Sequence, residues 1–135
     1  MSSTNPSIDS TLQHLREVRK CLLRLHKALL DSERIGYEQF YGPIQSSGEF
    51  LGLVIDHEWF NWLHPISQFI VQIDEIIFSK EAVSLDQVNA LLEKTRTLLQ
   101  PNEEGSEMEV RYNQALQRDA GLALMHSELM RMLSN

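Results

Sequence analysis

The chain has 135 residues, of which 42% are hydrophobic and 23% are charged, and its formal net charge is −7. This length fits one domain with a single hydrophobic core, and the apolar content excludes an intrinsically disordered chain. The negative charge would repel a phosphate backbone, so we expect no nucleic-acid partner. A single cysteine, Cys21, cannot form a disulfide within the chain, which favours a reducing compartment.

The N-terminal segment 1–7 is polar and lacks the basic and apolar regions of a signal peptide. The most apolar windows, 50–55 and 69–78, are too short to cross a bilayer. We therefore predict a cytoplasmic protein without membrane insertion, with a flexible N-terminus at 1–7 and one helical-bundle domain at 8–133.

Residues 8–31 are predicted to form the first long helix, because apolar residues recur there at helical spacing. That seam consists of Ile8, Leu15, Val18, Leu22, Leu25 and Leu29. Arg16, Lys20 and Arg24 belong to the charged side of the same helix. We interpret them as a solvated face, with a site for an anion or a lipid headgroup as the alternative.

Residues 32–47 are expected to form a connection with short helical pieces, because Gly36, Gly42 and Pro43 are breaker signals. Tyr37, Phe40 and Tyr41 give this connection an aromatic content that is typical of a segment packed on the core. A short helical turn is predicted at 37–41.

The segment 50–75 holds both tryptophans and an interior proline, and it predicts a buried, kinked central helix. Residues 49–55 are expected to be helical, and Asp56 is expected to cap a new segment that begins at His57. Pro65 disfavours a continuous helix at the residue before it, so a kink or break is predicted there. The apolar stripe of 65–79 covers most of the circumference, which is typical of a buried helix.

Two capping boxes mark later helix starts, since Ser84 is followed by Gln87 and Ser106 by Glu109. The first predicts a helix that ends near Gln100, and the second predicts one last helix that reaches about residue 133. Together these elements predict an all-α, four-helix-type bundle with a kinked or broken second helix near Pro65.

Three histidines are the candidate ligands for a metal or a small molecule. His57 and His64 are seven residues apart on one helical face, and a metal site there would need a histidine from another helix, such as His126. The competing interpretation of His126 is a buried side chain that is hydrogen-bonded to a neighbour, because it lies beside an apolar stripe. No catalytic motif is found, and no cofactor is predicted.

The aromatic segment has two interpretations, because Trp59, Phe60 and Trp62 cannot all point inward from one helix. They either pack in the core under the preceding connection, or part of the cluster forms a partner or dimer surface. Met130, in the methionine-rich last helix, is a further interface candidate. Asp74 is expected to form an ion pair with an arginine of a later helix (Arg96, Arg111 or Arg118).

The pattern Trp59-Phe60-x-Trp62-Leu63-x-Pro65-x-Ser67, followed by Ile70-Val71-x-x-Asp74-Glu75, resembles small uncharacterised bacterial helical proteins. The resemblance covers about a fifth of the chain. It implies a bacterial source and a helical bundle, and it brings no activity, cofactor or catalytic residue.

The sequence therefore favours a non-enzymatic protein-interaction module that binds a partner protein or forms a homodimer through the aromatic segment or the last helix. The alternative is a metal- or small-ligand-binding bundle that uses His57 and His64.

Overall fold

The computed structural model describes residues 6–134, and this range contains six α-helices and one 3₁₀ helix but no strand. The predicted all-α fold class is therefore confirmed. The elements are α1 (Pro6–Tyr41), α2 (Ser47–Asp56), η1 (Glu58–Leu63), α3 (His64–Ile77), α4 (Leu85–Leu98), α5 (Glu107–Arg118) and α6 (Ala120–Leu133). Of the predicted flexible N-terminus, residues 1–5 lie outside the described range, and residues 6 and 7 begin α1.

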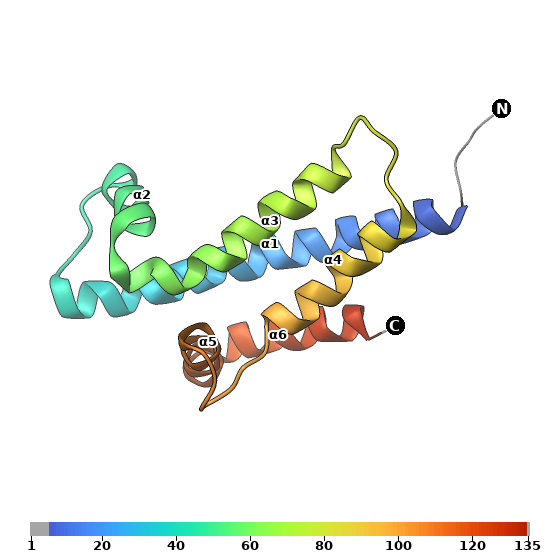
Figure 1. Ribbon diagram of the computed structural model, residues 1–135. Coiled ribbons are helices and arrows are strands. Elements are labelled where there is room, and N and C mark those ends of the chain that lie inside the picture. The colour runs from blue at the N-terminus through green and yellow to red at the C-terminus, as the bar shows by residue number, and fades with distance from the viewer. Residues whose placement is uncertain (1–5, 135) are drawn as a thin grey trace.

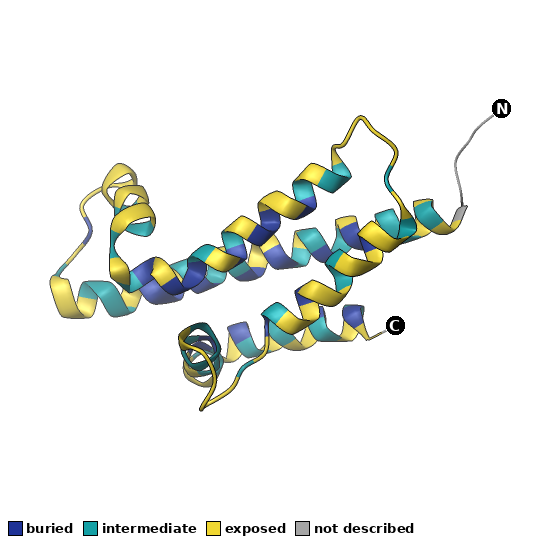
Figure 2. Cartoon of the chain, in the orientation of Figure 1, coloured by how far each residue is buried: buried dark blue, intermediate teal, exposed yellow. Residues whose placement is uncertain are grey.

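Helix α1 runs through nearly the whole length of the molecule, and α3, α4 and α6 lie along it (Figure 1). Its predicted apolar seam is confirmed from Leu15 to Leu29, where every member is fully buried. Figure 2 shows these buried positions as a band through the middle of α1 and along α3. The core is completed by side chains from the other elements, including Phe60, Ile66, Phe69, Ile73, Tyr112, Leu122 and Leu129.

The predicted end of the first helix near residue 31 is wrong, because α1 continues for about three more turns to Tyr41. The aromatic side chains explain the extension, since Tyr37 packs on Phe60 with ring centroids 5.7 Å apart. The helix ends where Gly42 adopts a φ of 100°, a conformation that favours glycine. The prediction that Gly42 interrupts the helix is therefore confirmed. The same prediction for Gly36 is wrong, because α1 continues through Gly36, which packs against Trp59.

The chain changes course between α2 and α3 through the 3₁₀ helix η1. The prediction that Asp56 caps the next segment is wrong, since Asp56 ends α2 and the His57 imidazole caps η1, accepting the Trp59 amide at 3.0 Å. Pro65 lies in the first turn of α3, where a missing N–H costs no intrahelical bond. The prediction of a helix buried over most of its circumference is wrong, because α3 buries one face only. Val71 on α3 and Phe78, just after its end, are exposed.

Both predicted capping boxes are confirmed, at Ser84 with Gln87 and at Ser106 with Glu109. The prediction of a single last helix is wrong, because the helix is interrupted at Asp119, which separates α5 from α6. The Asp119 carboxylate accepts the Gly121 and Leu122 amides at 2.9 and 3.3 Å, and so caps α6. The break turns α5 away from the direction of α6 (Figure 1). Within residues 6–134, no helix has both the length and the apolar character that crossing a bilayer requires.

Candidate functional site

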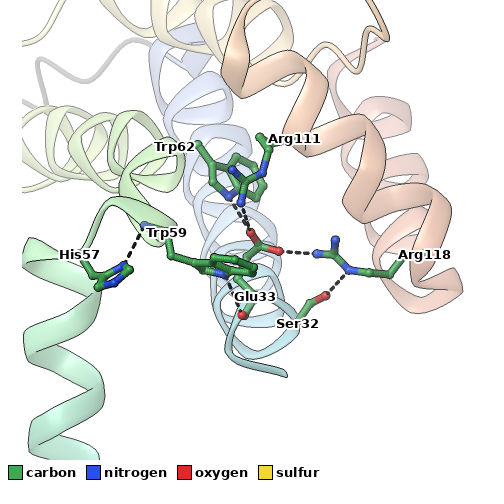
Figure 3. Close-up of polar contacts among 7 residues, drawn as sticks. All are labelled: Ser32, Glu33, His57, Trp59, Trp62, Arg111 and Arg118. Carbon is green, nitrogen blue, oxygen red and sulfur yellow. Dashed lines mark hydrogen bonds and ion pairs between the residues drawn. The ribbon is translucent and has the colours of Figure 1, made fainter. Parts of the chain in front are cut away.

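A buried carboxylate, Glu33 of α1, is the centre of the most extensive polar network in the described part of the chain (Figure 3). Its side chain is only 4% exposed. Oε1 accepts the indole N–H of Trp62 at 2.8 Å and Nη2 of Arg111 at 3.0 Å, and Oε2 accepts Nη2 of Arg118 at 2.5 Å. Three elements, α1, η1 and α5, therefore meet at one carboxylate.

Helical spacing explains how these groups meet. Glu33 follows Leu29 by four residues and precedes Tyr37 by four, so it continues the buried seam of α1. Arg111 and Arg118 are seven residues apart, which places both on one face of α5.

Trp59 forms a wall beside this network. Its indole N–H donates to the Glu33 carbonyl oxygen at 3.1 Å, and the Arg111 guanidinium lies 5.7 Å from the centre of its ring system. The ring packs directly against Gly36, where an added Cβ would approach Trp59 Cζ2 to 3.1 Å. Glycine at position 36 therefore permits the close approach that fixes the indole.

An open cleft of about 780 Å³ lies above the network, between the last turns of α1 and the exposed side of α5. Arg111, Gln114 and Arg118 line it from α5, and Trp59 lines it from η1. The α1 wall consists of Ser32, Glu33, Ile35, Gly36, Gln39 and Phe40, and Asp119 lies at the α5–α6 junction. A smaller cavity of about 360 Å³ shares Trp59 and Arg111 with this cleft, so the two hollows adjoin.

The electrostatics of the cleft are set by two arginines that share one carboxylate. Arg118 also donates from Nε to Ser32 Oγ at 3.1 Å, which orients its guanidinium. The two arginine side chains are 29% and 45% exposed, so they hold Glu33 with one edge and face solvent with the other. This arrangement can bind an anion, because a guanidinium has about five N–H donors and the contacts above use few of them.

The histidine candidates do not come together as a metal site. His57 uses Nδ1 as the cap of η1, and His64 Nε2 is hydrogen-bonded to the Val54 carbonyl at 2.8 Å. The hydrogen bond predicted for His126 is confirmed, since its Nδ1 bonds to the Tyr112 hydroxyl at 2.7 Å, but the side chain is half-buried and not fully buried. Among residues 6–134, no group of three or more His, Cys, Asp or Glu side chains is placed to hold a metal ion.

The interface candidates in the aromatic segment need a correction. Phe60 and Trp62 are buried within the chain, and Trp59 and Met130 are half-buried, so the core interpretation holds for the first two. The aromatic side chains of α1 that were expected to cover this cluster do so, as Tyr37, Phe40 and Tyr41 all make ring contacts with Trp59.

Arg16, Lys20 and Arg24 are exposed on α1, in agreement with a solvated face. The predicted partner of Asp74 is wrong, because Asp74 pairs with Arg19 of α1. Arg96 instead reaches the Leu133 carbonyl, while Arg111 and Arg118 are engaged by Glu33.

Sequence reasoning missed Glu33 and did not connect the two arginines of α5. The signal that could have found Glu33 was its position on the seam after Leu29, at a place where an apolar residue would be expected. Comparison with known proteins adds no assignment, since no protein-family model, curated protein or solved structure matches the chain.

Proposed function

We propose that this protein is a non-enzymatic interaction module whose α2 binds an amphipathic helix of a partner protein. The observation that carries the proposal is that α2 has no buried residue although half of it consists of large apolar side chains. Phe50, Leu53 and Val54 are half-buried against the core, whereas Leu51 and Ile55 are 60% and 58% exposed. An apolar helix without a partner on its outer face is a typical docking element.

The outer face of α2 has the spacing of a helix-packing stripe. Gly48, Leu51, Gly52 and Ile55 are separated by three, one and three residues, so they lie on one side of the helix. A Cβ built on Gly52 meets no atom within 4 Å, so the backbone there is open to a close neighbour. A second helix could therefore approach between the two large apolar side chains.

The acidic residues in and beside α2 indicate which kind of partner helix would bind there. Between Arg34 and Lys80 the chain has no lysine or arginine, but it has six acidic residues, of which Glu49, Asp56 and Glu58 are exposed in or beside α2. A partner helix with an apolar stripe flanked by lysine or arginine complements this surface. A symmetric homodimer through α2 would place the same acidic residues opposite one another, so we infer a different protein as the partner.

Helices α1, α3, α4 and α6 are proposed to act as a four-helix-type bundle that holds α2 in place, with the α2–η1–α3 segment as a second helix broken before Pro65. The mutual contacts of α1 with α3, α4 and α6 support this arrangement. A bacterial source rests on the sequence resemblance, and a cytoplasmic location rests on the lone Cys21. The net charge of −7 argues against a nucleic-acid partner.

Binding of two labelled synthetic helices, measured by fluorescence anisotropy, tests this proposal. One peptide has a leucine stripe flanked by lysines, and the other has the same stripe flanked by glutamates. We expect only the lysine peptide to bind, and we expect the double substitution Leu51→Ser with Ile55→Ser to weaken binding at least about tenfold, because it removes both exposed anchors. Val71→Ser, at an exposed apolar position of α3, is the matched control and should bind normally.

Sedimentation of the unlabelled protein separates partner binding from self-association. A monomer is expected for the wild-type chain. If the wild-type chain is a dimer and the Leu51→Ser, Ile55→Ser variant is a monomer, the partner of α2 is a second copy of this chain and not a different protein. Equal binding of both peptides, or binding that the double substitution leaves intact, would contradict a docking role for α2.

A further inference from the structure

We propose that the cleft between the end of α1 and α5 binds a small aromatic carboxylate. Arg111 and Arg118 would hold the carboxylate, and Trp59 and Phe40 would contact the ring. This inference is independent of the role of α2, because the lining of the cleft includes no residue of that helix. The cleft volume, about 780 Å³, lies within the range of about 300–1,000 Å³ typical of small-molecule sites.

The positive charge at the base of the cleft exceeds what Glu33 neutralises. Two guanidinium groups face one carboxylate there, so Glu33, Arg111 and Arg118 carry a net charge of +1 among themselves, and the lining as a whole is formally neutral once Asp119 is counted. Asp119 is the other acidic residue in the lining, and its carboxylate is engaged by the first amides of α6. Because Arg111 uses one N–H donor and Arg118 uses two in these contacts, their remaining donors can bind an additional carboxylate without displacing Glu33.

The geometry favours a carboxylate that bridges the two arginines. Arg111, Gln114 and Arg118 all line the cleft from α5, and Gln114 lies between the two arginines along the helix. Glu33 fixes one edge of each guanidinium from below, and Ser32 fixes Arg118 further, so the donors that face the cleft are preorganised. A planar carboxylate matches the forked N–H donors of a guanidinium, whereas the ammonium group of a lysine would offer only a point charge.

The opposite wall is aromatic and defines the rest of the ligand. Phe40 is 75% exposed although it lies only 6.2 Å from Trp59, ring centre to ring centre. The indole is fixed by its hydrogen bond to the Glu33 carbonyl and by the close contact with Gly36. A flat apolar group that enters the cleft would cover both rings, and Ile35 on the same wall adds apolar surface.

Nuclear magnetic resonance of the two indole N–H groups provides a direct test, because Trp59 lines the cleft and Trp62 lies beneath it, bonded to Glu33. The probe is phenylacetate, with acetate and 2-phenylethanol as matched compounds that lack the ring or the charge. We expect phenylacetate to shift the Trp59 resonance in a saturable manner, and each matched compound to bind at least about tenfold more weakly, since each loses one class of contact.

Two variants locate the binding. Arg118→Gln should weaken phenylacetate binding about tenfold or more, because one charged hydrogen-bond donor group is lost while Arg111 still pairs with Glu33. Phe40→Ala removes an exposed ring and keeps the test valid if Arg118→Gln does not fold. Phe78→Ala, at a similarly exposed phenylalanine outside the cleft, is its control and should bind as the wild type does.

Three outcomes would overturn the inference. The first is that phenylacetate leaves both indole resonances unchanged up to its solubility limit. Inorganic phosphate or acetate could shift Trp59 as strongly as phenylacetate, which would make the cleft a general anion site. Phe40→Ala and Phe78→Ala could weaken binding equally, which would place the ligand elsewhere.

Discussion

Glu33 shows how much a single buried charge can depend on its partners. The carboxylate is removed from water and is compensated by Trp62, Arg111 and Arg118. Loss of its charge leaves two cations without their counterion. We expect Glu33→Gln to lower the free energy of unfolding by about 3 kcal/mol, at the lower end of the range for a broken buried pair because both arginines are partly exposed. Urea denaturation measures this change.

Glu93→Gln is the matched control at the surface. Glu93 lies 3.6 Å from Arg96 one turn away, and both side chains are well exposed. Its loss should cost less than about 1 kcal/mol, because water already solvates both charges. Similar losses in the two variants would mean that the Glu33 network contributes no more than a surface ion pair.

Two partly buried histidines should make the stability fall in mildly acidic solution. Burial lowers the pKa of the His26 and His126 imidazoles below their ordinary value of about 6.5. The unfolded chain therefore binds protons at a higher pH than the native protein does. Stability should be constant above pH 7 and should decrease as the pH falls through about 6.5 towards the lowered native pKa values.

Melting temperatures measured between pH 8 and pH 5 test this dependence. The double variant His26→Gln with His126→Gln should lose part of the decrease, whereas His14→Gln, at a site outside this pair, should retain it. The range below pH 5 is left out because carboxylates begin to titrate there. One of them is Glu109, whose pKa is lowered chiefly by the hydrogen bond from the Ser106 backbone amide. An unchanged slope in the double variant would contradict the assignment to these two imidazoles.

At the scale of elements, two glycines with different backbones should respond to alanine in opposite directions. Gly42 ends α1 with a φ of 100°, a conformation that strains any residue with a Cβ, so Gly42→Ala should destabilise the protein by about 1 kcal/mol. Gly52 is a helical residue of α2 with no atom within 4 Å of an added Cβ, so Gly52→Ala should stabilise it by about 0.5–1 kcal/mol. Chemical denaturation of both variants gives the comparison, and a shared sign would contradict it.

The starts of α4 and α5 could be predicted, whereas the end of α1 could not, and the reason is local chemistry. Ser84 and Ser106 form side-chain bonds within three residues, so their capping boxes could be read directly from the sequence. The extension of α1 beyond residue 31 depends on the packing of Tyr37 and Gly36 against η1, which is distant in sequence. The Asp119 cap is also local, but the apolar repeat continues on both sides of it and so indicated one uninterrupted helix.

The candidate site could not be predicted from the sequence, because it too depends on contacts between segments that are distant in the chain. Histidines are common metal ligands and were therefore the predicted site, yet His57 and His64 are hydrogen-bonded to backbone groups in the structure. Glu33 lies between Ser32 and Arg34, so it resembles an ordinary polar residue in one dimension. Its importance arises only when α5, about 80 residues later in the chain, brings Arg111 and Arg118 to it.

For the whole molecule, burial divides the chain into a stable centre and a less stable end. The middle of α1 is surrounded by α3, α4 and α6, whereas α2 buries no residue and packs chiefly on η1. Local opening requires little free energy where few apolar contacts are lost. We therefore expect the amides of α2 to exchange with deuterium well before those of residues 15–29, when exchange is followed by mass spectrometry under native conditions.

The lysine-flanked peptide helix links this stability difference to the proposed function. Bound to the outer face of α2, it should slow exchange in α2 while leaving the already protected middle of α1 unchanged, because a ligand stabilises the state to which it binds. Phenylacetate should have no such effect on α2, since its proposed cleft includes no α2 residue. Amides of α2 that are as protected as those of residues 15–29 in the free protein would show that α2 has a partner within the chain and is not available for docking.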